Sequence, residues 1–120
     1  MIEKLVQVGI LFDFYGNLLT KKQYLAIDLY YINDLSLAEI GERIGVSRQG
    51  VFDTIRRAEK NLFEYEDKLK LVNKFKRNQD DIMSIIDDSR EIIKLSTSNK
   101  IDDIKKKAEN IIKTGEKLIE

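Results

Sequence analysis

The sequence contains no cysteine and no histidine among its 120 residues. Disulfides, thiolate nucleophiles, imidazole bases and zinc sites with nitrogen or sulfur ligands are therefore excluded. Proline is also absent and only six glycines are present, so little in the chain interrupts a helix. These absences favour a protein of long helices, in which we expect no cofactor and no metal ion.

Long apolar runs and an excess of one charge are missing as well. No run approaches the roughly 20 apolar residues that cross a bilayer, so we expect a cytoplasmic protein without a membrane span or signal peptide. Basic and acidic residues number 21 each, which means that any nucleic-acid surface must be a local patch. Hydrophobic residues make up 42% and charged residues 35%, a balance typical of a globular chain.

Paired carboxylates are the remaining groups that could support acid-base or metal chemistry. They occur at Asp80 and Asp81, at Asp87 and Asp88, and at Asp102 and Asp103. Because the two members of each pair are adjacent, their side chains diverge on a helix, which favours a solvated surface. We therefore expect the protein not to be an enzyme.

Apolar spacing predicts an all-α chain with a domain over residues 1–75 and a C-terminal extension over residues 76–120. The first helix spans Ile2 to Tyr15 and ends at Gly16 and Asn17. It has two apolar faces, so it either lies wholly in the core or also meets a second subunit. One face carries Leu5, Val6, Gly9 and Phe12, and the other carries Val8, Leu11 and Tyr15.

Two capping boxes mark the next helix starts. Thr20 with Gln23 opens a helix that ends at Asn33 and Asp34, and Ser36 with Glu39 opens a second, shorter helix. In each box the hydroxyl accepts from the backbone amide three residues on, while the longer side chain reaches back to the first amide.

A long amphipathic helix begins at Ser47, because apolar residues then recur in steps of three and four as far as Val72. We place a break near residues 70–79, since an unbroken helix to Leu95 would reach roughly 70 Å. Asn99 is predicted to cap a last helix with a heptad ladder of apolar residues. The C-terminal part is thus either a helical hairpin or one strand of a dimeric coiled coil.

The stretch from Ser36 to Lys60 has the placements of a helix-turn-helix. Gly41 is small where the two helices cross, and Gly45 forms the turn, since glycine readily adopts the left-handed conformation. The apolar positions that pack the first helix on the second are Ile40, Ile44, Val46, Val51 and Ile55. Some units of this kind contact DNA or RNA, whereas others bind proteins or only build a core.

If the second helix enters a major groove, its first turns present the base-contacting and phosphate-contacting side chains. Arg48 suits guanine, Gln49 suits adenine and Phe52 suits a thymine methyl group. The candidate nucleic-acid-binding residues are Ser47, Arg48, Gln49, Phe52, Asp53, Arg56, Arg57 and Lys60. Residues 47–60 carry four basic and two acidic groups, a net charge of +2, so tight binding to phosphates requires a dimer.

Gly50 lies inside this second helix, where glycine costs about 1 kcal/mol relative to alanine. Two interpretations are open. Gly50 either permits close approach of a partner backbone or has no particular role.

Three strings carry a resemblance to a known family: LFDFYGNLLTKKQ (residues 11–23), the run of residues 28–60, and YEDKLKL (residues 65–71). They resemble the YlxM family of bacterial helix-turn-helix proteins over about residues 1–75. The helix-turn-helix is also similar to the wingless promoter-reading domain of major sigma factors. The resemblance implies an all-helical homodimer whose DNA-contacting positions are Arg48, Gln49, Phe52, Asp53 and Arg56.

The resemblance further implies a regulator that acts with the signal recognition particle and its GTPases. Two functions therefore compete. One is an adaptor that binds the particle's protein, its RNA or its receptor. The other is a dimeric, sequence-specific DNA-binding transcription regulator, in which long helices space two recognition helices about 34 Å apart.

Overall fold

Two compact units make up the chain, Met1–Val72 and Asn73–Glu120. The structure is a computed structural model that describes residues 2–119, and every regular element within that range is helical. The all-α fold predicted from the sequence is confirmed. We call the first unit the helix-turn-helix unit and the second the hairpin unit. The division between them falls a few residues before the predicted boundary at residues 75 and 76.

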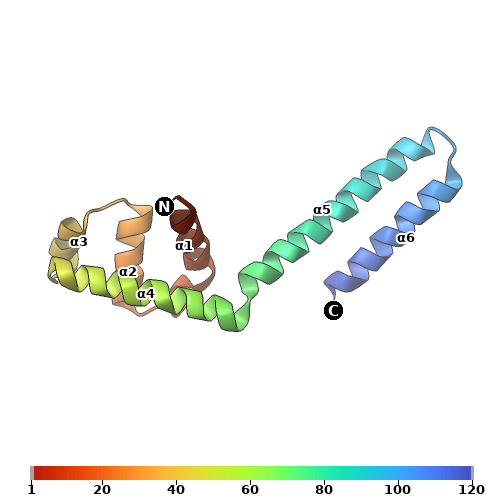
Figure 1. Ribbon diagram of the computed structural model, residues 1–120. Coiled ribbons are helices and arrows are strands. Elements are labelled where there is room, and N and C mark those ends of the chain that lie inside the picture. The colour runs from red at the N-terminus through yellow and green to blue at the C-terminus, as the bar shows by residue number, and fades with distance from the viewer. Residues whose placement is uncertain (1, 120) are drawn as a thin grey trace. The chain divides into compact units, whose positions relative to one another are not determined.

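The helix-turn-helix unit contains α1 (Ile2–Tyr15), α2 (Lys21–Ile27), α3 (Leu37–Ile44) and α4 (Arg48–Leu69). Figure 1 shows α4 running along the other three helices, and it contacts each of them. One side of α4 therefore closes the core, and the other side remains free of this packing. The side chains that are wholly buried in this core are Val8, Tyr15, Ala26, Ile27, Ile40, Val51, Ala58 and Leu62.

Only one of the two apolar faces of α1 is fully buried. Val8, Leu11 and Tyr15, which form this face, lie in the core together with Phe12 from the other face. Leu5 and Val6, which also belong to the other face, remain about half exposed. The second face is therefore covered at Phe12 but not at Leu5 and Val6 by the residues that the structure describes.

The predicted helix boundaries are largely confirmed. Both capping boxes are present, with all four hydrogen bonds 3.0–3.2 Å long. Gly45 ends α3 in the left-handed conformation, with φ 71°. Lys70 ends α4 in the same conformation, which places the expected break at the N-terminal edge of the interval 70–79.

Two local predictions are wrong. The helix that begins after Thr20 does not continue as an α-helix, because residues Asp28–Ile32 form a π-helical turn closed by the Asn33 amide donating to Asp28 O at 3.0 Å. Asn99 does not cap the last helix. It adopts a left-handed φ of 58° in the connecting turn, and Lys100 takes the capping position without a side-chain hydrogen bond.

The hairpin unit consists of most of α5 (Leu71–Ser96) together with α6 (Ile101–Leu118). The two helices run antiparallel beside each other (Figure 1). Two ion pairs join them, between Asp88 and Lys107 at 3.5 Å and between Asp81 and Lys117 at 3.6 Å. The sequence left open either a helical hairpin or one strand of a dimeric coiled coil. Within one chain, the two helices form the hairpin.

Candidate nucleic-acid interface

A tight corner between α3 and α4 fixes the direction of α4. The amides of Gly45 and Val46 both donate to Gly41 O, at 2.9 and 3.1 Å. A Cβ atom on Gly41 would lie only 2.6 Å from Val46 O, so the close approach of the chain at this point requires glycine. Ser47 then caps α4 by accepting from the Gly50 amide at 3.0 Å.

The inner side of α4 is fixed by its burial. Val51, Ile55, Ala58 and Leu62 lie in the core with at most 4% of their surface exposed. Because these residues recur every three or four positions, the opposite side of the helix must point to solvent. The core thus determines which residues of α4 are available to a partner.

Every predicted contact residue on α4 is exposed, and so is Ser47 at its start. They form a continuous surface that we call the reading face, which comprises Arg48, Gln49, Phe52, Asp53, Arg56, Arg57 and Lys60. Ser47 differs from the others because its hydroxyl oxygen already accepts the capping hydrogen bond. Its role in the structure is therefore to start the helix.

Two pairs of side chains on the reading face hold each other in place. Gln49 Nε2 donates to Asp53 Oδ1 at 3.1 Å, which leaves the Gln49 carbonyl oxygen as an acceptor. The guanidinium carbon of Arg56 lies 5.6 Å from the centre of the Phe52 ring, a cation-π arrangement. Both pairs are one helical turn apart, so the helix itself sets their geometry.

Glu59 lies beside the reading face on the same helix, but its carboxylate is held by Tyr31 and Lys4. It is only 8% exposed, it accepts a short hydrogen bond from the Tyr31 hydroxyl, and Lys4 lies 3.2 Å from its other oxygen. Burial and this hydrogen bond raise the pKa of Tyr31 far above its usual range. With Glu59 neutralised by Lys4, residues 47–60 expose four basic groups and one acidic group, a net charge of +3.

Two residues near the reading face were missed by the sequence analysis. Lys4 and Phe63 line a hollow together with Arg56, Arg57, Glu59 and Lys60. Phe63 follows Phe52 by 11 positions, about three helical turns, and this spacing was a signal that could have identified it. Lys4 is on α1, and no sequence pattern links it to α4.

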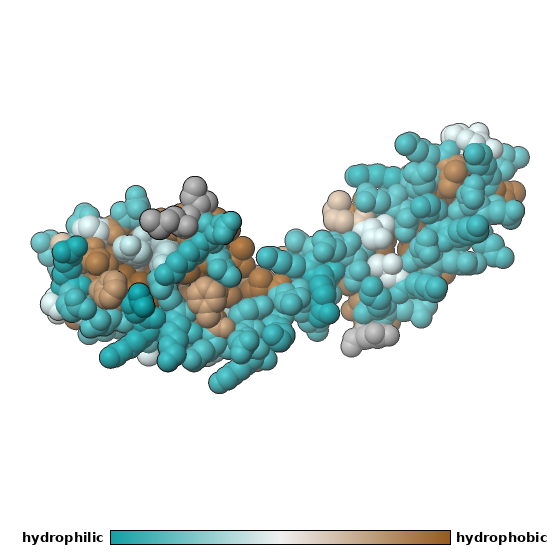
Figure 2. Space-filling view, in the orientation of Figure 1, coloured by the Kyte–Doolittle hydropathy of each residue, from teal (hydrophilic) through white to brown (hydrophobic). Residues whose placement is uncertain are grey.

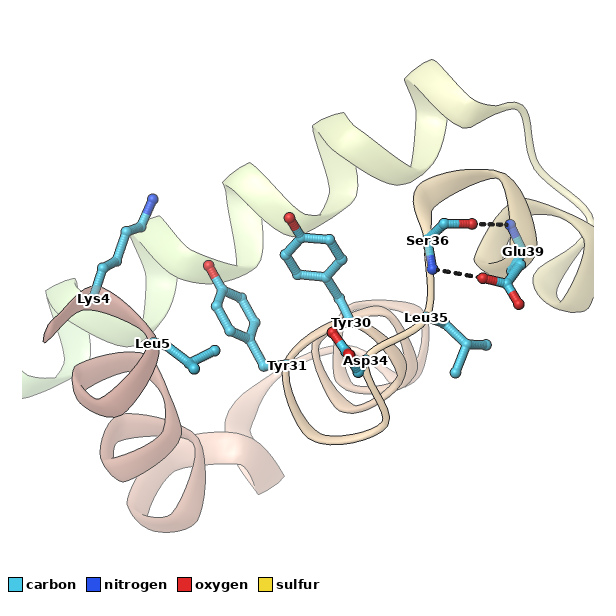
Figure 3. Close-up of a pocket in the computed structure, with 8 residues that line it drawn as sticks. All are labelled: Lys4, Leu5, Tyr30, Tyr31, Asp34, Leu35, Ser36 and Glu39. Atoms are coloured by element: carbon cyan, nitrogen blue, oxygen red, sulfur yellow. Dashed lines mark hydrogen bonds between the residues drawn. The ribbon is translucent and has the colours of Figure 1, made fainter. Parts of the chain in front are cut away.

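A second hollow lies beside α1, at the π-helical turn and the loop that leads to α3 (Figure 3). Tyr30 and Tyr31 project into it, with their rings edge to face at 5.1 Å. Leu5 and Leu35 add apolar surface, and Asp34 and Glu39 add acidic groups. The hydrogen bonds that Glu39 makes with Ser36 lower the pKa of its carboxyl group, so it remains ionised. This hollow suits a protein partner better than nucleic acid.

Among residues 2–119, no cluster of three or more acidic side chains is arranged to hold a metal ion. No helix in the same range combines the length and the apolar character needed to pass through a bilayer.

The sharp corner after α3, with α4 buried along one side and exposed along the other, defines a helix-turn-helix protein. The chain belongs to the family described as "Putative helix-turn-helix protein, YlxM / p13 like", whose model matches residues 2–104. The match extends through α5 into α6, well beyond residues 1–75, which contain the three strings that carry the resemblance.

Curated relatives support the same assignment. The chain is 54% identical over 79 residues to a UPF0122 protein of Bacillus thuringiensis (strain Al Hakam), an alignment that covers 66% of this chain and 72% of the relative. A UPF0122 protein of Bacillus mycoides (strain KBAB4) shows the same identity and coverage. A third, from Bacillus cereus (strain AH187), is 53% identical over the same length.

Proposed function

We propose that the protein is a non-enzymatic regulator that reads duplex DNA with the reading face of α4. The observation that carries the proposal is the orientation of α4. Its inner side is fixed by the core, and its outer side presents four basic and two preorganised polar or aromatic groups at the start of the helix. A helix held in this way can enter a major groove without rearrangement.

Each residue of the reading face has a role in this proposal. Arg48 donates two hydrogen bonds to guanine, and Gln49 pairs with adenine while Asp53 holds its amide in position. Phe52 packs against a thymine methyl group. Arg56, Arg57 and Lys60 neutralise phosphates and fix the register of the helix on the duplex.

Two copies acting together suit the modest charge of this surface. A net charge of +3 neutralises few phosphates, so one copy alone binds weakly at physiological salt. A dimer doubles the number of contacts and matches two half-sites about 34 Å apart. We therefore expect the protein to bind a site with two-fold symmetry.

The test is a selection of genomic DNA fragments followed by gel shift. Each lost base contact costs about 1–3 kcal/mol, so replacing Arg48 and Gln49 together by alanine should weaken binding to the selected site at least tenfold. Arg57→Ala should instead weaken all sequences equally and lower the salt slope by about one. Arg90→Ala, which removes an exposed arginine from the hairpin unit, is the matched control. Failure to retain any fragment above random duplex would contradict the proposal.

A second candidate is an adaptor in the signal recognition particle pathway, with the particle's protein, its RNA or its receptor as partner. The hollow that Tyr30, Leu35 and Leu5 line favours it, because exposed tyrosine side chains are typical of protein-binding surfaces. Pull-down with the particle's protein and with its receptor GTPase tests this candidate. Tyr30→Ala should abolish capture, whereas Arg48→Ala should not. Absence of binding to both proteins by a folded chain removes it.

A further inference from the structure

The hairpin unit has no core of its own. No described residue of α6 is buried, and the one buried residue of α5 is Val72, which packs against the helix-turn-helix core. Both helices are nevertheless rich in isoleucine. Two helices can cover only the surfaces that face each other, so the position of the remaining isoleucines decides what else the hairpin binds.

The apolar residues of α5 fall on two adjacent sides of the helix. Ile85 and Ile92 are half-buried in the seam with α6. A second row remains open, and at 100° per residue its members lie within a sector of about 40°. This row contains Ile82, Ile86 and Ile93, which are 47%, 36% and 69% exposed.

The same division occurs on α6. Ile104 and Ile111 are half-buried in the seam. A second row, within a sector of about 20°, contains Ile101, Ile112 and Ile119, which are 69%, 59% and 86% exposed. Figure 2 shows hydrophobic surface on the hairpin among its charged side chains.

The two open rows lie on the same face of the hairpin. On each helix the open row follows the seam residues in the same rotational sense, by about 90° on α5 and about 75° on α6. Because the helices are antiparallel, an equal sense of rotation brings both rows to one side. The ion pairs provide an independent check, because all four charged residues lie on the opposite rotational side of the seam.

We propose that this apolar face, formed by both open rows, binds the same face of a second copy of the chain, so that two hairpins form a four-helix bundle. The six isoleucines expose about 650 Å² per copy, which gives roughly 1,300 Å² for two copies, within the range of a stable interface. A hairpin with one apolar face is half of such a bundle.

Charge favours a second copy over other occupants. The isoleucines of the apolar face are flanked on α6 by the exposed Lys105 and Glu116, one charge of each sign, and residues 76–120 contain ten basic and ten acidic groups. Nucleic acid and strongly charged proteins therefore find no net charge to pair with on this face. An identical surface covers it without adding net charge. The bundle deepens the proposed function, since it would join two reading faces, but it rests on different residues.

The mass of the full chain in solution tests the bundle. At micromolar concentration we expect twice the 14.0 kDa of one chain. Replacing Ile82 and Ile93 together by glutamate should raise the dissociation constant at least 100-fold and leave a monomer. Ile32→Glu is the matched control, because Ile32 is 56% exposed but belongs to the helix-turn-helix unit. A wild-type monomer, or a double variant that remains dimeric, would overturn the proposal.

Cysteine cross-linking keeps the test valid if the glutamate variant unfolds. The natural chain has no cysteine, so one engineered thiol reports a single position. Ile82→Cys, Ile86→Cys and Ile112→Cys are compared with Ser84→Cys on the charged side of α5. A bis-maleimide of short reach should link at least one of the first three into a covalent dimer, and equal linking at Ser84 would reject the face. Arg48→Ala with Gln49→Ala should lose DNA but stay dimeric, so the two proposals can fail separately.

Discussion

The two units use isoleucine at the same helical spacing but with opposite results. In the helix-turn-helix unit Ile27, Ile40 and Ile55 are at most 4% exposed, whereas in the hairpin unit Ile82 and Ile93 are 47% and 69% exposed. The difference is the number of directions from which a helix is covered. Three helices pack around α4, but α5 has one neighbour in its own unit. Periodicity thus identifies an apolar face without indicating what covers it.

Removing a core side chain from each unit tests this difference most strongly. Ile40→Ala should lower the free energy of unfolding of the helix-turn-helix unit by about 2–5 kcal/mol, because the neighbours of a wholly buried side chain cannot fill the cavity. Ile104→Ala in the half-buried seam should cost much less. All five tyrosines are in the helix-turn-helix unit, so their fluorescence during urea unfolding reports that unit alone, while far-ultraviolet circular dichroism reports the helices of both units. Equal losses in the two variants would contradict the comparison.

Replacing glycine by alanine should change the stability of the two units in opposite directions. Gly41→Ala forces a Cβ atom against Val46 O, and we expect a loss of about 1–3 kcal/mol as the corner shifts. Nothing lies within 4 Å of a Cβ at Gly115, which is inside α6, so Gly115→Ala should stabilise the hairpin by about 0.5–1 kcal/mol. Thermal unfolding followed by circular dichroism measures both. A destabilised Gly115→Ala variant would show that another surface approaches α6 at that point.

The join between α4 and α5 provides a smaller effect. The Tyr15 hydroxyl donates to Glu66 Oε1 at 2.6 Å and accepts from the Leu71 amide at 3.0 Å, so it connects α1 with the first turn of α5. Tyr15→Phe should cost about 1–2 kcal/mol, since it removes the acceptor of a part-buried amide. Tyr24→Phe is the control, because the Tyr24 ring packs on Phe12 at 4.7 Å and is largely exposed. Similar losses in both would exclude a special role for the Tyr15 hydroxyl.

Alkaline pH should lower the stability of the helix-turn-helix unit alone, and this should be the smallest of the predicted effects. Burial, followed by hydrogen bonds to Glu66 and Glu59, raises the pKa of Tyr15 and Tyr31. A raised pKa stabilises the fold fully below the ordinary tyrosine value of about 10, and this stability is lost as the pH rises toward the higher folded value. Urea unfolding of the helix-turn-helix unit at pH 8.5 and 10.5 should show the loss. Tyr31→Phe should reduce this pH dependence, and an unchanged dependence would rule out Tyr31 as a source.

Most of the local structure was predictable, because it depends on short-range chemistry. Thr20 with Gln23 and Ser36 with Glu39 form capping boxes, since each needs only four consecutive residues. The π-helical turn at Asp28–Ile32 was not predictable, because its residues favour an α-helix. The wider turn arises only when the chain folds. Asn99 illustrates the same limit, since asparagine suits both a cap and a left-handed turn.

The exposure of the candidate site residues was predictable, but the charge of their surface was not. The helical period placed Arg48, Gln49 and Arg56 on one surface, because Val51 and Ile55 had to face the core. Glu59 was counted as part of that surface, yet it is buried against Tyr31 and Lys4, which come from two other helical segments. No spacing along α4 indicates these partners, so only folding revealed the more basic reading face.

The sequence by itself determined where most helices start and stop, which face of each is apolar, and that a glycine corner separates α3 from α4. These features follow from interactions between residues a few positions apart, which any chain with this pattern would make. Tertiary structure decided which apolar faces are covered, where Glu59 is oriented and which side of the hairpin remains open. Those features depend on contacts between distant segments, whose meeting is fixed by the packing of the whole chain rather than by any local pattern.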